Sequence, residues 1–366
     1  MPGSGQGRRV GTGPSEGSGG SSPRANTVNV LIASPLEPEY AERIATADPR
    51  VRLLYAPELL PLPRYRGDHT GIKRDLSAGE LARWSQLRAD ADVSFDFDWQ
   101  AIDQIPANSP DLRWIQGTSA GIGGLLERTG LIDAPIVFTT AAGVHGVPLA
   151  EFALFGLLYF AKGVPVLHEW QARRHWQRHT TRQLRGSRAV LVGLGGVGRQ
   201  VASLLTTSGI EVTGIGRPGR GYEVPGVSAY ADDTQLAQVL PGADALVLAC
   251  PLTERTRGLI GRTELEAMPA NSVLVNLSRG QVTDEAALID SLASGHLGGA
   301  CLDVFETEPL PASSPLWALP NVLISPHSAS TVSAENELIT ELFIDNLRRW
   351  LADQPLRNTF DVTAGY

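Results

Sequence analysis

The sequence predicts an α/β protein of two domains built on doubly wound parallel sheets. Three observations support this fold class. The chain has 366 residues, more than one hydrophobic core usually serves. Two series of short apolar segments alternate with helical patterns, as parallel sheets require. A glycine-rich turn joins a strand to an amphipathic helix early in the second series.

The first series starts at residue 28. Its strands are predicted at "VNVLIAS", "DVSFDF", "LRWIQGTSAGIGG" and "APIVFTTAAG", and a helix is predicted at "PEYAERIATAD". From Pro148 to Arg185 the pattern is helical and then strongly basic, with Trp170 and Trp176, which predicts a linker helix followed by an arm.

The second series starts at Arg188. Its six predicted strands are "RAVLVGLG", "EVTGIG", "ALVLAC", "SVLVNLS", "GGACLDVF" and "NVLISPH". The segment "SAENELITELFIDNLRRWLADQP" has apolar residues at helical spacing and is predicted to form a terminal helix. Periodicity does not decide which domain that helix joins.

The composition argues against nucleic acids and membranes as partners and so favours small molecules or proteins. The net charge is −8, and a nucleic-acid surface needs a concentrated basic stripe, so no nucleic-acid partner is expected. No apolar run reaches the roughly 18 residues of a membrane span, so no membrane partner is expected. Cys250 and Cys301 lie in apolar runs and are predicted to be buried reduced thiols, which favours the cytoplasm. Residues 1–26, rich in Gly, Ser and Pro, are predicted to be a disordered tail.

The turn "GLGGVG" has the spacing of a dinucleotide-binding loop. Gly193 permits a tight turn, Gly195 lets backbone N–H groups approach a pyrophosphate, and Gly198 lets the helix pack closely on the strand. The alternative is an ordinary glycine-rich turn. The order of strand, loop, helix and second strand favours the dinucleotide.

The end of the next strand predicts which dinucleotide is bound. A site that prefers NAD usually has an acid about 20 residues past the loop, bonded to the ribose 2′-hydroxyl. Here that position is Gly216, followed by Arg217 and, nearby, Arg220. A glycine leaves room for a 2′-phosphate and a guanidinium pairs with it, so NADP is favoured and NAD stays possible. Alternatively, these arginines are solvated loop residues.

Three polar residues follow later strands of this series, where open α/β sheets bind ligands. They are Arg279, Glu308 and His327. Reduction of a 2-oxo acid places negative charge on the carbonyl oxygen, so it needs a proton donor and a cation there. Histidine can donate the proton, and a nearby carboxylate favours its charged form and fixes its tautomer. Taken singly, each residue is more often a surface or capping residue.

Together, "GLGGVGR", "CPLTERTRGLI", "NLSRG", "LDVFETEP" and "SPH" resemble the D-isomer-specific 2-hydroxyacid dehydrogenases, which include glyoxylate/hydroxypyruvate reductases. The resemblance runs from Val28 to the terminal helix. It implies two Rossmann-like or flavodoxin-like domains, with a dinucleotide-binding domain (142–326) inserted in a substrate domain (27–141 and 327–366). It also implies a homodimer in which the arm crosses between subunits.

The resemblance assigns roles residue by residue. Arg279 would bind the substrate carboxylate, His327 would be the acid/base and Glu308 its partner, with no metal. The remaining implied contacts are, for the substrate carboxylate, Ser119, Ala120 and Gly121 and, for the nucleotide, Gly196, Val197, Cys250, Pro251, Thr256, Leu277, Ser278 and Asp303. His145 and His296 are expected to be structural. The expected substrate is glyoxylate or hydroxypyruvate.

Two other interpretations remain. A dinucleotide-sensing protein without turnover would need the glycine loop but not the three polar residues. A formate or phosphonate dehydrogenase would share the fold, but formate oxidation needs no carbonyl proton donor. The turn "AAGVHG" departs from the family pattern, and residues 54–71, "LYAPELLPLPRYRGDHTG", match no motif.

Overall fold

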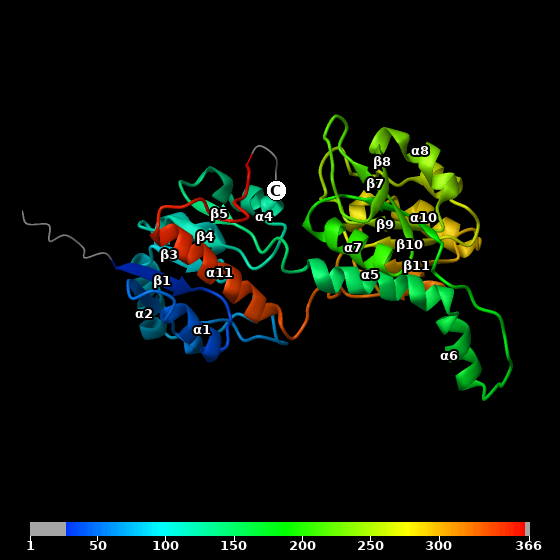
Figure 1. The fold of residues 1–366 in the computed structure, drawn as a ribbon. Helices are drawn as coiled ribbons and strands as arrows, with labels where there is room; N and C mark the ends of the chain where they lie inside the picture. The colour runs from blue at the N-terminus through cyan, green and yellow to red at the C-terminus, as the bar shows by residue number, and fades with distance from the viewer. Residues whose placement is uncertain (1–26, 363–366) are drawn as a thin grey trace, which may run out of the picture.

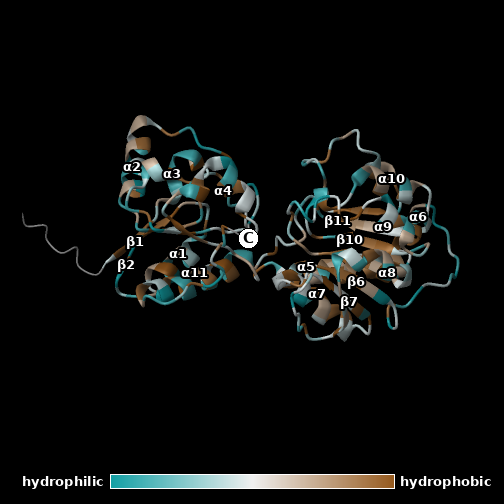
Figure 2. Ribbon diagram, turned by 90° about the horizontal axis from the view of Figure 1, so that it is seen from above, coloured by the Kyte–Doolittle hydropathy of each residue, from teal (hydrophilic) through white to brown (hydrophobic). Residues whose placement is uncertain are grey.

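The computed structural model describes residues 27–362, so the predicted tail at residues 1–26 lies outside the described residues. The chain forms two lobes (Figure 1). Within the described range it passes between them twice, after strand β5 (Val137–Thr139) and again before helix α11 (Glu335–Leu351). Each lobe holds one parallel sheet, and the apolar strands lie between helices (Figure 2). The predicted fold class is therefore confirmed.

The sheet of the first lobe has five strands in the order β2-β1-β3-β4-β5, all paired in parallel. This is the flavodoxin-like order. Besides β5, its strands are β1 (Val28–Ile32), β2 (Val51–Leu54), β3 (Val93–Phe95) and β4 (Trp114–Gln116). Besides α11, its helices are α1 (Pro38–Ala45), α2 (Ala78–Ala89), α3 (Ile105–Asn108) and α4 (Gly123–Thr129). Strand β2 was not predicted, because it is a short edge strand with an exposed arginine.

Helix α11 closes the core of the first lobe. The ring of Trp114 on β4 stacks on Phe343 at 5.1 Å and on Trp350 at 5.7 Å, and Phe343 also meets Phe95 edge-on at 5.3 Å. Aromatic pairs at these distances add to the stabilisation from burial. The last helix therefore packs on the sheet formed by the start of the chain, which the periodicity alone did not decide.

The sheet of the second lobe has seven parallel strands in the order β12-β11-β10-β9-β6-β7-β8. They are β6 (Arg188–Val192), β7 (Glu211–Gly216), β8 (Val227–Asp232), β9 (Ala245–Leu248), β10 (Val273–Asn276), β11 (Gly299–Leu302) and β12 (Val322–Ile324). The prediction of six strands missed β8, an edge strand that is largely exposed. The strand order reverses between β6 and β9, and a crevice at such a reversal is where doubly wound sheets bind ligands.

Six helices accompany this sheet among the described residues. They are α5 (Gly146–Ala161), α6 (Val164–Ala172), α7 (Gly196–Thr207), α8 (Leu236–Val239), α9 (Arg262–Ala267) and α10 (Glu285–Ala293). Helix α5 packs closely on the sheet at Gly156, where the lack of a side chain leaves room for Cys301. A Cβ at Gly156 would lie 2.7 Å from the Sγ of Cys301. Helix α6 projects from the lobe and contains no buried residue (Figure 1).

By length and apolar composition, none of the helices within residues 27–362 is by itself long enough to cross a membrane. Helices α5 and α6 pass that test only as a pair, and they are bent by 60° where they meet.

Replacing Phe343 with Ala should lower the free energy of unfolding by about 3–5 kcal/mol, because a cavity would open beside the rings of Trp114 and Phe95. The measurement is urea unfolding followed by tryptophan fluorescence. Leu338→Ala is the control on the same helix, since Leu338 is 38% exposed, and its expected cost is within about 0.5 kcal/mol. Equal losses for the two variants would contradict the central place of Phe343.

Candidate active site

The glycine loop after β6 has the geometry of a phosphate cradle. Gly193 has a φ of 101°, and a Cβ there would lie 2.6 Å from the main-chain nitrogen of Cys250. A Cβ on Gly198 would overlap the carbonyl oxygen of Gly193, so the helix rests on the turn. By contrast, a Cβ on Gly195 would meet nothing within 4 Å. The N-terminus of α7 therefore faces open space, where its N–H groups and dipole suit a diphosphate.

The other residues expected near the nucleotide follow the ends of β9, β10 and β11. Cys250 is buried, and burial raises the pKa of its thiol to about 11. This thiol therefore lines the site without acting as a nucleophile. Thr256 donates a hydrogen bond of 2.7 Å to the carbonyl of Pro251 and so shapes the turn after β9. Leu277 and Ser278 are buried directly after β10.

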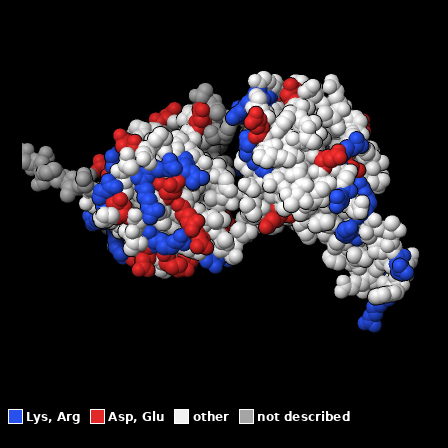
Figure 3. Space-filling model, viewed as in Figure 1, with Lys and Arg blue, Asp and Glu red and all other residues white. Residues whose placement is uncertain are grey.

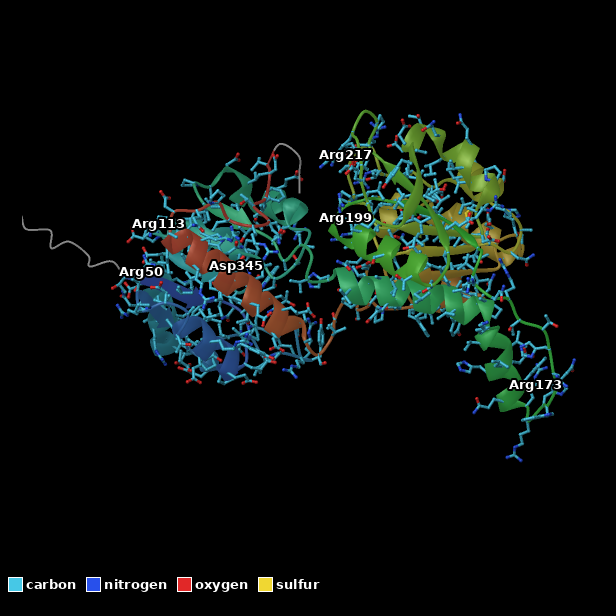
Figure 4. All side chains as sticks on the ribbon, in the orientation of Figure 1. Arg50, Arg113, Arg173, Arg199, Arg217 and Asp345 are labelled. Atoms are coloured by element: carbon cyan, nitrogen blue, oxygen red, sulfur yellow. The ribbon has the colours of Figure 1, made fainter. Side chains whose placement is uncertain are left out.

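The loop after β7 differs in one respect from the expectation. The space beside Gly216 is filled by the ring of Tyr222, which a Cβ at residue 216 would overlap. The Tyr222 hydroxyl accepts a hydrogen bond of 3.0 Å from the main-chain nitrogen of Arg217, and the guanidinium of Arg220 lies 5.6 Å from the ring centroid. Arg217 and Arg199 lie on the side of the second lobe that faces the first (Figure 4). Sequence reasoning missed Tyr222 because no motif covers the loop.

His327 and Glu308 form a hydrogen-bonded pair. The Nδ1 of His327 lies 2.8 Å from one carboxylate oxygen of Glu308, while the other accepts a 3.0 Å bond from the main-chain nitrogen of Phe305. Burial alone would raise the pKa of Glu308. The bonds from His327 and Phe305 and the charge of Arg279 outweigh burial, so the pKa of this carboxyl is lowered. The glutamate is thus held as an anion beside the imidazole.

Asp303 organises the segment that carries His327. This carboxylate is buried, and its Oδ1 accepts hydrogen bonds from the Ser325 hydroxyl at 2.6 Å and from the main-chain nitrogens of Ser328 and Ala329 at 2.9 Å. Its main-chain oxygen accepts a 2.9 Å bond from the nitrogen of His327. These contacts hold His327 at a φ of 53°, a left-handed conformation that is uncommon outside glycine and often found at functional sites.

Arg279 faces the first lobe. Its Nη1 donates a 2.7 Å hydrogen bond to the carbonyl of Ser278. Its Nη2 lies 2.8 Å from where a Cβ on Gly121 would be, so the turn 119–121 approaches the guanidinium from across the cleft. The three residues of that turn are exposed, and the cleft is the notch between the lobes in Figure 3. The structure therefore brings Arg279 together with the predicted substrate turn.

The two other histidines singled out in the sequence have structural partners. His296 bonds to the carbonyl of Leu265 at 3.1 Å. His145 lies at the start of α5, buried, with its Nε2 3.1 Å from Glu335 at the start of α11. This pair joins the two segments by which the chain passes between the lobes. Glu335 was not singled out in the sequence, because its partner is 190 residues away.

Known proteins match this chain over most of its length. Residues 154–329 match the family model for the NAD binding domain of D-isomer specific 2-hydroxyacid dehydrogenases. An (S)-sulfolactate dehydrogenase of Chromohalobacter salexigens is 33% identical over 68% of this chain and 80% of its own length. Glyoxylate/hydroxypyruvate reductase A of Enterobacter sp. is 34% identical over 60% of this chain and 72% of its own.

Solved structures give the same result. A D-isomer specific 2-hydroxyacid dehydrogenase from Xanthobacter autotrophicus, in complex with NADPH, superimposes with a TM-score of 0.74 at 29% identity, over 93% of this chain and 100% of that one. An NADPH-dependent glyoxylate/hydroxypyruvate reductase from Sinorhizobium meliloti gives 0.73 at 25% identity with the same coverage. This chain therefore belongs to the D-isomer specific 2-hydroxyacid dehydrogenases, a family of NAD(P)-dependent oxidoreductases.

Proposed function

We propose that this chain reduces a small 2-oxo acid, of the glyoxylate or hydroxypyruvate kind, to the D-2-hydroxy acid and prefers NADPH to NADH. The observation that carries the proposal is the convergence on one cleft of the Arg279 guanidinium, the exposed turn 119–121 and the His327–Glu308 pair. A cation, a set of backbone donors and a proton donor are what the carboxylate and carbonyl of such a substrate require.

In this proposal each side chain has one task. Bound NADPH supplies the hydride that reduces the substrate carbon. Arg279 binds the carboxylate and polarises the neighbouring carbonyl oxygen. Because Nδ1 of His327 is engaged by Glu308 at 2.8 Å, Nε2 is the atom left to give a proton to that oxygen. Glu308, bonded to Nδ1, fixes the orientation of the ring so that Nε2 faces the substrate.

In this proposal one lobe binds the substrate and the other binds the dinucleotide. Among the described residues, 27–141 and 327–362 form the substrate domain in this proposal, and residues 142–326 form the dinucleotide domain. Closing the cleft excludes water from the reacting groups before hydride transfer. The open side of the glycine loop at Gly195 suits the diphosphate of either dinucleotide. The arginines after β7 are the feature that supports NADP, with NAD as the weaker ligand.

A second copy of the chain is the proposed partner. Helices α5 and α6 and the arm expose large apolar side chains, among them Phe155 at 49% and Trp176 at 96%. Such a surface is unfavourable in water, and a dimer that crosses the arms would cover it. The two buried free thiols suit a reducing compartment, and we place the protein in the cytoplasm.

The proposal is tested by a panel of 2-oxo acids assayed with NADPH and NADH, following the absorbance of the reduced nicotinamide. His327→Ala should lower kcat by about 10²- to 10⁴-fold, because the proton donor is lost. Binding of NADPH should stay unchanged, which separates chemistry from folding. The control is His296→Gln, outside the cleft. Unchanged turnover in His327→Ala would favour the alternative function, a dinucleotide-sensing protein without turnover.

Glu308→Gln tests the pair separately. Because the hydrogen bond from His327 helps to hold the pKa of Glu308 below its usual value, the carboxylate stays ionised until the pH falls below the ordinary glutamate range. Glu308→Gln removes this charge at every pH, so kcat should fall by about a hundredfold and the acidic loss of activity that comes from protonation of Glu308 should disappear. The measurement is kcat/KM across about pH 3 to 9. Glu306→Gln is the control, with the same change of charge on an exposed neighbour. An unshifted profile would contradict the pairing.

A further inference from the structure

The ring of Tyr222 occupies the place where many dinucleotide sites carry an acid. Gly216 ends β7, and a Cβ built on it would lie 2.7 Å from both Cδ2 and Cζ of Tyr222 and closer still to Cε2. These distances are shorter than any real carbon–carbon contact. A side chain at residue 216 and this position of the ring therefore exclude each other.

We propose that Tyr222 is a specificity-determining residue for the dinucleotide, because its ring excludes an acid at residue 216 and its contacts position the arginines that receive a 2′-phosphate. This inference rests on the proposed preference for NADPH. Tyr222 lies in none of the motifs found in the sequence. We call Gly216 and Tyr222 a matched pair, because the ring can take this position only while residue 216 has no side chain.

The polar contacts of Tyr222 give it the positioning role. Its hydroxyl accepts a hydrogen bond from the main-chain nitrogen of Arg217, and its ring lies under the guanidinium of Arg220. The Arg220 nitrogen in turn bonds to the Arg217 carbonyl at 3.3 Å, which closes the turn between the two arginines. A neutral ring in place of a carboxylate also adds no negative charge beside the phosphate.

The loop is braced at two further points. Arg199, in the first turns of α7, donates a 2.9 Å hydrogen bond to the carbonyl of Glu223. The hydroxyl of Tyr230 on β8 accepts a 2.7 Å bond from the nitrogen of Val224. Both contacts fix the path of the loop directly after Tyr222. Tyr230 provides the control, since its hydroxyl also bonds to the main chain of this loop, at the nitrogen and the carbonyl of Val224, whereas the atoms nearest to a Cβ on Gly216 are all those of Tyr222.

Adenosine 2′,5′-bisphosphate and 5′-AMP differ only in the 2′-phosphate, so their affinities isolate its recognition without catalysis. Isothermal titration calorimetry should show that Tyr222→Phe weakens the bisphosphate about threefold and Tyr222→Ala about tenfold, with 5′-AMP changed less than about twofold. Tyr230→Phe should leave the ratio of the two affinities as in the wild type. Thermal unfolding of each variant checks that it is folded.

The matched pair is tested by a double-mutant cycle. Gly216→Asp alone should weaken both ligands, because the new side chain must displace the ring. Adding Tyr222→Ala should restore 5′-AMP affinity by about tenfold relative to Gly216→Asp, while the bisphosphate stays weak. The same pattern is expected for NAD⁺ and NADP⁺ binding.

The outcomes of these titrations distinguish the proposed preference for NADPH from the proposed role of Tyr222. Wild-type protein that binds the bisphosphate no better than 5′-AMP would remove the proposed NADPH preference, and the role of Tyr222 with it. If the wild type prefers the bisphosphate but Tyr222→Phe and Tyr222→Ala keep that preference in full, only the role of Tyr222 is overturned. The same follows if Tyr230→Phe matches the loss in Tyr222→Phe, or if the effects of Gly216→Asp and Tyr222→Ala simply add.

Discussion

The buried carboxylate of Asp303 holds the segment on which both the active site and the shape of the molecule depend. It accepts three hydrogen bonds from residues 325–329. The main-chain carbonyl of Asp303 accepts a fourth, from the main-chain nitrogen of His327. Burial raises the pKa of this carboxyl, and the hydrogen bonds act against that shift. The same segment then leads into α11, which completes the core of the first lobe. One carboxylate therefore orients the imidazole and directs the chain back across the cleft.

Close backbone contacts bring the polar groups together from separate strands. A Cβ on Gly280 would overlap the carbonyl carbon of Phe305, so the segment after Arg279 lies directly on the segment before Glu308. Phe305 in turn donates to Glu308, and Glu308 meets His327. The charges that act on one another thus come from the ends of β10, β11 and β12, three neighbours in a parallel sheet.

The sequence predicted both sheets because buried parallel strands are continuous apolar runs. The edge strands β2 and β8 were not predicted, since their exposed positions carry polar residues that interrupt the apolar run. The rule that ligands bind at the carboxyl ends of strands was enough to group Arg279, Glu308 and His327 from the sequence. Sequence could not find Tyr222, whose role depends on a loop folding back over Gly216, nor the contact of Glu335 with His145. Both depend on tertiary packing, which leaves no local pattern.

The bond between His145 and Glu335 links the two segments that connect the lobes. It ties the start of α5 to the start of α11, so the two connecting segments meet at one buried point. The two connecting segments are therefore not independent of each other, because a change of direction in one is passed to the other through this buried bond.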